Sequence, residues 1–311
     1  MLALPLAACA GDAPSNVLYL VSDALRADAM SCYGGRAQTP NLCGLAADGV
    51  LFERAYANAP WTLPSVVAMF TGTYPLQHRR TVQGRAGEPL PFYYLDQSEY
   101  LLGEALSERG FEVTAVLENA VTRQPQVLQG FRILNRLRRN EGPLPVFASD
   151  KVVAGFGLAT SEKDYKPIAQ SIAHLLEVGE RAFFHVHWID DPHAPYRPPE
   201  DQQQEALRQA GELPNEPSFY KRLGHQNKGA RRHLRGVAPS LTPVEVAFIE
   251  RLYELEIESV DRRVGALLRT LEATGQRERT LIVFTSDHGE EFGEHGGFLH
   301  DHAMWDELIR V

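Results

Sequence analysis

The sequence predicts an α/β fold with a mainly parallel central sheet sandwiched by helices. Short apolar runs alternate along the chain with longer segments of helical periodicity, residues typical of helix ends bound these segments, and polar clusters follow the strands. The predicted strands span residues 16–21, 111–117, 182–188 and 281–286. The predicted helices span residues 40–46, 62–70, 101–109, 168–178 and 244–274.

Proline and glycine mark most of the predicted helix ends. Pro40 and Pro64 lie in the first turns of the first two helices, where the N–H that proline lacks has no intrahelical partner. Gly72, Gly110 and Gly179 follow the last apolar residues of three helices and are typical of helix C-termini. The last helix has apolar residues at helical spacing along its whole length, which indicates that it packs against the core.

The composition of the 311-residue chain excludes several classes of protein. Acidic residues outnumber basic ones by 40 to 31, and the net charge of −9 argues against a nucleic-acid-binding protein. No apolar run is long enough for a transmembrane helix. The three cysteines are too few for a disulfide scaffold or a cysteine-rich zinc site.

We expect one main domain, residues 16–311, preceded by a short segment, residues 1–15. Leu6-Ala7-Ala8-Cys9 resembles a bacterial lipoprotein cleavage box, which predicts acylation of Cys9, export to the periplasm and anchoring at a membrane surface. The alternative is a frayed apolar N-terminus on a cytoplasmic protein. Residues 198–240 are rich in proline, glutamine and arginine, which predicts a surface insertion or lid. The chain stops at Val311 inside an apolar pattern, so we expect it to be truncated.

Chemically useful side chains follow three of the predicted strands. Asp23 follows the first strand, His193 the third, and Asp287 and His288 the last. Because parallel strands end at one edge of a sheet, we expect these residues to converge there. Carboxylate oxygens and imidazole nitrogens are common metal ligands, so the sequence predicts a metal site at this edge. We interpret Gly289 as allowing a sharp backbone turn beside the ion.

Four of the eleven histidines gather within residues 288–302, a density that a solvated loop does not require. They are His288, His295, His300 and His302. At the other positions a structural alternative stays open. Asp23 and Asp287 could cap helices or turns, and Arg26 is either a surface arginine or a clamp for an anion. Thr62 is either a helix N-cap or a nucleophile placed where helix N–H groups stabilise negative charge.

Six segments, in order along the chain, resemble the landmarks of the sulfatase family, which belongs to the alkaline phosphatase superfamily. They are Asn16–Arg26, Cys32–Gly34, Thr39–Leu42, Thr62–Gly72, Asp191–Tyr196 and Thr285–Gly296. The resemblance implies an alkaline-phosphatase-like catalytic domain over residues 16–311, from which a smaller C-terminal subdomain is missing. It also implies a metal-dependent hydrolase that acts on an anionic ester.

By this resemblance, Asp23, Asp287 and His288 fall on metal-ligand positions. Thr62 falls where sulfatases have a cysteine or serine that is converted to formylglycine, and its hydroxyl completes the ligand set. The chain departs from the family pattern here, because threonine is not a formylglycine precursor and Val66 replaces the arginine of the nucleophile motif. The family often has a second aspartate after the first, but this chain has alanine at that position.

The resemblance also assigns His193 and His300 to contact with the substrate's anionic group or its leaving oxygen, and we add Arg26 as a substrate-binding candidate. One divalent cation is expected, with Ca²⁺ the first choice and Mg²⁺, Mn²⁺ or Zn²⁺ as alternatives. A second cation would require a cluster drawn from His187, Asp191, His300 and His302.

The single hydroxyl of Thr62 cannot repeat formylglycine chemistry, in which a second hydroxyl expels sulfate. A threonine ester must instead be cleaved by a second attack at sulfur or phosphorus, which favours phosphate or phosphonate esters over sulfate esters. The expected function is therefore ester hydrolysis through a metal-bound threonine. The alternatives are a transferase of phosphoryl-linked head groups, similar to phosphoethanolamine transferases, and a binding protein without catalytic activity.

Overall fold

The computed structural model confirms the α/β fold. It describes residues 15–77, 95, 98–119, 122, 125–135, 154–156, 165–211 and 241–311. The predicted lipoprotein box at Leu6–Cys9 and residues 212–240 of the predicted insertion lie outside the described residues. No helix within the described ranges is long and apolar enough to cross a membrane.

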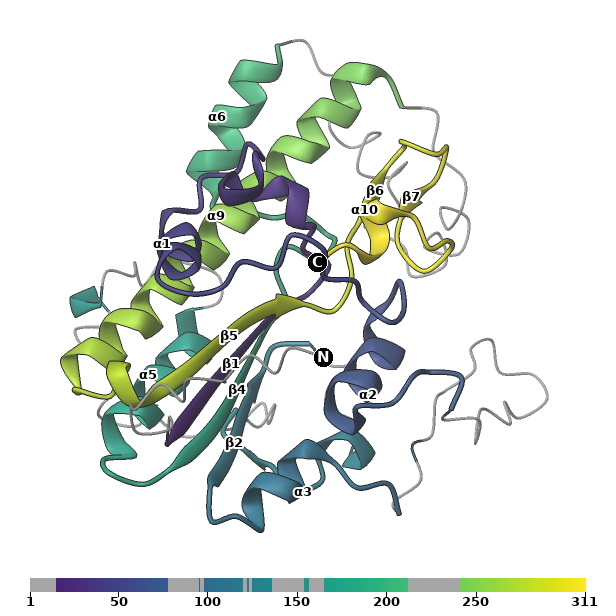
Figure 1. The fold of residues 1–311 in the computed structure, drawn as a ribbon. Helices are drawn as coiled ribbons and strands as arrows, with labels where there is room; N and C mark the ends of the chain where they lie inside the picture. The colour runs from purple at the N-terminus through teal and green to yellow at the C-terminus, as the bar shows by residue number, and fades with distance from the viewer. Residues whose placement is uncertain are drawn as a thin grey trace, which may run out of the picture.

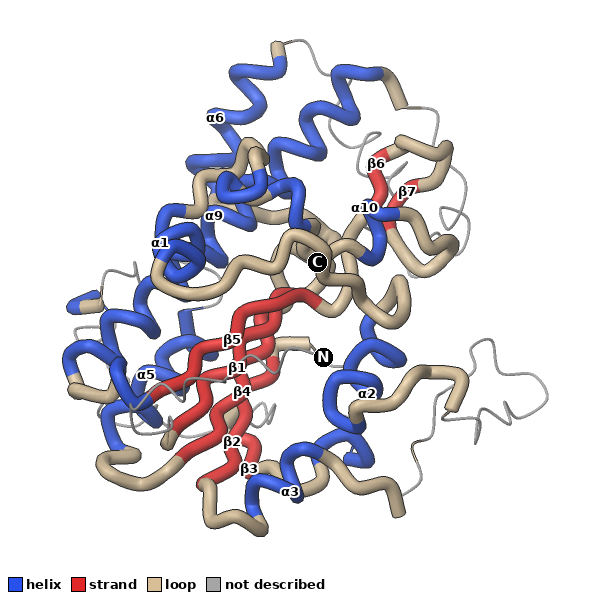
Figure 2. Tube along the Cα trace, viewed as in Figure 1, coloured by secondary structure: helices blue, strands red, loops and turns tan. Residues whose placement is uncertain are grey.

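A five-stranded sheet with the order β3-β2-β4-β1-β5 forms the centre of the molecule (Figures 1 and 2). Every pair of neighbouring strands is parallel, as predicted. The bounds are β1 (Asn16–Ser22), β2 (Glu112–Leu117), β3 (Arg132–Ile133), β4 (Phe183–Ile189) and β5 (Thr280–Ser286). Of the five strands in this sheet, only β3 was not predicted, because a strand of two residues is too short to give an apolar pattern.

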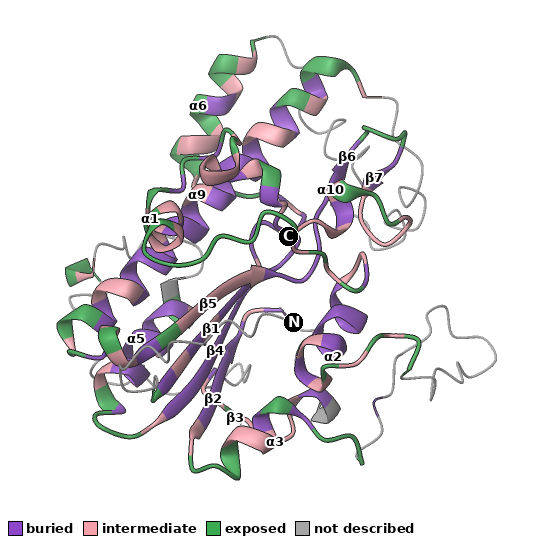
Figure 3. Cartoon of the chain, in the orientation of Figure 1, coloured by how far each residue is buried: buried purple, intermediate pink, exposed green. Residues whose placement is uncertain are grey.

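Alternate side chains of β1 point to opposite faces of the sheet, and the core is divided into two clusters accordingly. Leu18 and Leu20 pack into one hydrophobic cluster, with residues of α1 (Pro40–Ala47), α5 (Tyr165–Glu177) and α9 (Pro243–Ala273). Val17, Tyr19 and Val21 belong to a second cluster, with α2 (Thr62–Thr71) and residues that flank α3 (Leu102–Ser107). Helices therefore cover both faces of the sheet, and the three inner strands β1, β2 and β4 are largely buried (Figure 3).

The predicted helices are all present, with ends shifted by a few residues. Gly72, at φ 70°, ends α2, and Gly179, at φ 61°, lies just beyond α5. The capping box of Thr242 and Glu245 begins α9, which is 31 residues long.

The segment expected to be irregular contains a helix, α6 (Glu200–Ala210), which packs on α9. Only Ala206 of this helix is buried, so its sequence lacks the apolar stripe that would have predicted it. The C-terminal region adds the antiparallel pair β6 (Glu291–Phe292) and β7 (Phe298–Leu299), followed by α10 (Asp306–Ile309). These elements are likewise too short to predict from periodicity.

Candidate metal centre and active site

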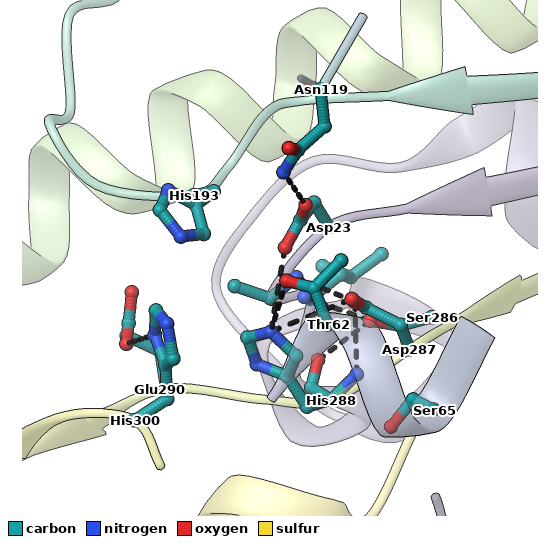
Figure 4. Close-up of polar contacts among 12 residues, drawn as sticks. Asp23, Thr62, Ser65, Asn119, His193, Ser286, Asp287, His288, Glu290 and His300 are labelled. Carbon is teal, nitrogen blue, oxygen red and sulfur yellow. Dashed lines mark hydrogen bonds and ion pairs between the residues drawn. The ribbon is translucent and has the colours of Figure 1, made fainter. Parts of the chain in front are cut away.

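Two neighbouring strands bring the predicted carboxylates together. β1 pairs with β5 in the register Ser22 to Ser286, so the next residues, Asp23 and Asp287, leave the sheet side by side. His288 follows directly. One ligand atom from each of these three residues lies within 4.8 Å of the others, and all three side chains are fully buried (Figure 4).

Each carboxylate has one oxygen satisfied by hydrogen bonds and one without a hydrogen-bond partner. Oδ2 of Asp23 accepts from the side chains of Asn119 and Trp188, and Oδ1 of Asp287 accepts from the backbone N–H groups of Ala24 and His288. Oδ1 of Asp23 and Oδ2 of Asp287 are buried and accept no hydrogen bond in the described part of the chain. Buried carboxylate oxygens without donors are costly unless a cation compensates them.

His288 presents its free nitrogen to both of these oxygens. Its Nδ1 lies 2.8 Å from the carbonyl oxygen of Gly289, which fixes the Nδ1–H tautomer of the neutral ring. Its Nε2 then lies 3.4 Å from Oδ1 of Asp23 and 3.4 Å from Oδ2 of Asp287. In that tautomer all three facing atoms carry lone pairs. This donor set fits a divalent cation, which Asp23, Asp287 and His288 would hold.

The pKa values of the three groups also indicate that the site favours a bound positive charge. Burial raises the pKa of Asp287, and the neighbouring charge of Asp23 raises it further, to about 7. Burial also raises the pKa of Asp23, but the neighbouring imidazoles of His193 and His288 lower it more, to about 2. Burial lowers the pKa of His288, but the two carboxylates raise it more, to about 10. Without a cation the site therefore takes up a proton.

The N-terminus of α2 places the predicted nucleophile beside this cluster. Thr62 is the first residue of the helix and is 5% exposed, and its Oγ1 lies 3.3 Å from Nε2 of His288. The N–H groups of the first helical turn have no intrahelical acceptors and favour negative charge nearby. The neighbouring hydroxyl of Ser65 is turned away, because it donates to the carbonyl of Ala59.

Two further imidazoles complete the group in Figure 4. The ring centroid of His300 lies 4.4 Å from that of His288 and 4.9 Å from that of His193. Nδ1 of His300 donates to Oε1 of the buried Glu290, whose other oxygen accepts from Tyr196. Nδ1 of His193 donates to the carbonyl of Ala194. Each ring therefore has its Nε2 left for contacts within the site.

A model of the family described as Sulfatase matches residues 15–311. The chain belongs to the sulfatase family. The uncharacterized sulfatase YidJ of Escherichia coli is 24% identical over 326 residues, covering 95% of this chain and 61% of its own length. The multifunctional alkaline phosphatase superfamily protein PehA of Trinickia caryophylli is 25% identical over 342 residues, covering 90% of this chain and 64% of its own.

Solved structures agree with the fold. The phosphonate monoester hydrolase of Agrobacterium radiobacter has a TM-score of 0.67 and 23% identity, covering 95% of this chain and 66% of its own. A putative sulfatase from Bacteroides thetaiotaomicron has a TM-score of 0.58 and 19% identity, covering 94% of this chain and 62% of its own. This sulfatase-family chain thus has an alkaline-phosphatase-like fold and spans about 60% of the length of the curated relatives named above.

Arg26, predicted to bind substrate, is already paired in this sulfatase-family chain. Its guanidinium donates to the carboxylates of Asp28 and Glu294 and to the carbonyl of Glu290. Two carboxylates therefore compensate much of its charge, and its role in substrate binding stays a prediction.

The residues suggested for a second cation do not come together. His187 hydrogen-bonds to Ser171 and Glu118 within the core, Asp191 pairs with an arginine of α9, and His302 hydrogen-bonds to Glu291. Of the four, only His300 lies beside the ligand cluster.

Gly289 corrects one physical interpretation. Its φ is not in the left-handed region, so the glycine is not required for a sharp turn. A Cβ atom at this position would instead lie 2.0 Å from the backbone oxygen of Glu307. The glycine allows the segment around Glu307 to approach the metal-binding turn, and its N–H donates to the carbonyl of Leu308.

The sequence reasoning missed Asn119 and Glu290, which hold Asp23 and His300. Glu290 lies inside the motif that begins at Asp287, so its position was a usable signal. Asn119 follows the end of β2, at the same edge as the other strand ends, and only the order of the strands in the sheet could have identified it.

Proposed function

We propose that this sulfatase-family protein is a metal-dependent hydrolase that cleaves phosphate, phosphonate or sulfate esters with Thr62 as the nucleophile. One observation carries the proposal. The Thr62 hydroxyl meets Nε2 of His288 at the point where that nitrogen faces the donor-free oxygens of Asp23 and Asp287. The phosphonate monoester hydrolase of Agrobacterium radiobacter has a similar fold, and the ester class in its name is one of those proposed here.

A divalent cation held by Asp23, Asp287 and His288 would supply Lewis-acid stabilisation of negative charge at this point. The chain's own part begins with Thr62, whose Oγ1 loses its proton to water and attacks phosphorus or sulfur. The first-turn N–H groups of α2 stabilise the developing charge on the ester oxygens. A bond forms between Oγ1 and phosphorus while the bond from phosphorus to the leaving oxygen breaks.

His193 and His300 face the other side of the reacting group. Burial lowers the pKa of His300 to about 4, so this ring is neutral, with its proton on Nδ1 toward Glu290, and its Nε2 can only accept. We therefore assign the transfer of a proton to the leaving oxygen to Nε2 of His193. Water then attacks the phosphorus of the Thr62 ester and releases the threonine hydroxyl.

The single hydroxyl of Thr62 favours phosphorus esters over sulfate esters. Formylglycine releases sulfate by breaking a bond at carbon, whereas a threonine ester has no second hydroxyl to drive that step. It must be cleaved by a second attack at the central atom.

The proposal is tested with chromogenic p-nitrophenyl esters of phenylphosphonate, phosphate and sulfate. The protein is stripped with a chelator and then supplied separately with Ca²⁺, Mg²⁺, Mn²⁺ or Zn²⁺. We expect metal-dependent release of p-nitrophenol, faster from the phosphorus esters than from the sulfate. A metal-loaded protein inactive on all three esters would be a binding homologue. Turnover that requires an added alcohol, with the phosphoryl group recovered on that alcohol, would identify a transferase.

A further inference from the structure

Helix α9 carries a buried polar stripe that packing alone does not explain. Tyr253, Glu256 and Arg263 are at most 2% exposed. Their spacings of three and seven residues place them on one side of the helix. The apolar periodicity of this segment predicted a helix that only packs against the core, but this side faces the loops of the active site.

Arg263 connects the buried carboxylate of Glu118, which follows β2, to that of Asp191, at the start of the loop that carries His193. Its Nη1 donates to Oε2 of Glu118 at 3.2 Å, and its Nη2 donates to Oδ2 of Asp191 at 2.7 Å. Oε2 of Glu118 also accepts from the N–H of Asp190 at 3.2 Å. The N–H of His193 then donates to the carbonyl of Asp190 at 3.0 Å. The guanidinium of Arg263 thus holds Asp191 directly and Asp190 through Glu118, and the turn that carries His193 begins at these two residues.

The same side of α9 holds the far end of this loop and the loop after β1. The carboxylate of Glu256 accepts from the N–H of Arg197. The hydroxyl of Tyr253 donates to the carbonyl of Ala24 at 2.8 Å and accepts from the N–H of Arg26 at 2.9 Å. Ala24 directly follows the metal-ligand candidate Asp23. One rigid helix therefore sets the loop after β1 and the loop after β4 relative to each other.

Stability alone is a poor reason for this arrangement. A buried ion pair is often no more stabilising than apolar side chains of the same volume, because desolvation offsets the attraction. Because Arg263 binds Glu118 and Asp191 with different nitrogens of one planar guanidinium, it sets a fixed distance between them, which a flexible lysine cannot reproduce. Catalytic groups misplaced by about 1 Å can lose roughly 100-fold in rate.

We propose that Arg263 is a positioning residue, which acts through Glu118 and Asp191 to hold His193 over Thr62 and the metal-binding cluster. The chemical role of His193 rests on the proposed function. The position of its loop does not, because the contacts of Arg263 with Glu118 and Asp191 are present whatever the protein hydrolyses.

The test compares Arg263→Lys with Asp261→Asn. Asp261 lies on the same helix and is 1% exposed, but its carboxylate accepts from Asn41 and Leu42 at the start of α1, away from the active-site loops. For Arg263→Lys at saturating metal we expect kcat to fall about 10- to 100-fold, with metal affinity retained. Asp261→Asn should lower the melting temperature and leave kcat within about twofold of the wild type.

A double-variant cycle separates positioning from general weakening. If Arg263 acts through His193, kcat of the double variant should be less than about twofold lower than kcat of His193→Ala alone. Losses that multiply, or an unchanged kcat in stable Arg263→Lys, would overturn the proposal. Glu118→Gln, which removes one of the two carboxylates, is the substitute if Arg263→Lys does not fold, and the same loss in kcat is expected.

Crystal structures of the variants make the outcome independent of turnover. We expect the loop of residues 190–197 and the His193 ring to shift in Arg263→Lys and to stay in place in Asp261→Asn. A wild-type protein that hydrolyses no ester would refute the proposed function, and the loop positions would still decide the role of Arg263. An unmoved His193 in a well-ordered Arg263→Lys structure contradicts that role.

Discussion

Oγ1 of Thr62 lies 3.3 Å from Nε2 of His288, although 226 residues separate them in the chain. The contact joins two independent parts of the fold, the first turn of α2 and the turn after β5. Because Nε2 of His288 also lies 3.4 Å from a carboxylate oxygen of Asp23 and of Asp287, the threonine hydroxyl lies beside the candidate metal ligands. Trp61 holds the N-cap position of α2, so this hydroxyl is not the helix cap, and its place beside the cluster supports the proposed role of ligand or nucleophile.

Removing this hydroxyl should separate binding from chemistry. Thr62→Ala is expected to lower kcat about 1000-fold or more while the affinity for the divalent cation changes little, because three protein ligands remain. Thr71→Ala is the matched control, since it changes the same residue type at the other end of α2. Ester hydrolysis and metal binding by calorimetry measure the two effects. Wild-type kcat in Thr62→Ala would remove Thr62 from the mechanism.

Metal binding should appear as a gain in stability. The cation binds the folded chain and not the unfolded one, so a concentration about 100 times Kd adds about 2.7 kcal/mol to the free energy of unfolding. Asp287→Asn should abolish this gain. Without metal, the same variant should unfold no more easily than the wild type, because it removes one of two facing buried carboxylates. Denaturation in urea with and without the cation provides the measurement. A metal-dependent gain that persists in Asp287→Asn would exclude this ligand.

The sequence predicted the parts of the fold that have a regular pattern. The strands at β1, β2, β4 and β5 and the long helix α9 contain enough apolar residues for their period to be recognised. The two-residue strands and α6 do not, and they form through contacts with other elements: β3 pairs with β2, β6 pairs with β7, and α6 packs on α9. Ala206, for example, is buried only because α6 lies on α9.

Much of the site could be predicted for a related reason. Asp23, Asp287 and His288 directly follow strands, so the topology of a parallel sheet brings them to one edge. Asn119 and Arg263 reach the site through the order of the strands and the face of a helix, which the sequence does not reveal. The sequence likewise does not reveal that Arg26, a predicted substrate-binding residue, pairs with Asp28 and Glu294.

Gly289 should tolerate no side chain. A Cβ atom at this position would lie 2.0 Å from the backbone oxygen of Glu307, so Gly289→Ala must displace that segment and lengthen the hydrogen bond to Leu308. We expect a loss of about 1–3 kcal/mol in unfolding free energy and weaker metal binding. Gly44→Ala is the matched control, because no atom lies within 4 Å of its Cβ position in α1 and the change should stabilise by up to about 1 kcal/mol. Equal stability of the two variants would contradict the close approach.

His174 should make the fold sensitive to acid. It lies in α5 with its Nε2 3.0 Å from Oγ1 of Thr114, and burial lowers its pKa to about 4. The ordinary value near 6.5 applies to the unfolded chain. Between these two pH values the unfolded chain binds the proton and the folded chain does not. The stability contributed by neutral His174 is therefore present above about pH 6.5 and is lost as the pH falls to about 4, by at most about 3 kcal/mol.

The variant His174→Gln isolates this contribution. Glutamine keeps a polar group near Thr114 but has no proton to gain, so the variant should lose less stability than the wild type between pH 7.5 and pH 4.5. Urea denaturation at the two pH values gives the free energies of unfolding, and the comparison at pH 7.5 removes the cost of the substitution itself. We expect the wild type to lose about 2–3 kcal/mol more than His174→Gln across this interval. Because the neighbouring His185 is also buried and its pKa is also lowered, part of the acid sensitivity should remain in the variant. Identical losses in the two proteins would show that His174 is not held neutral by burial.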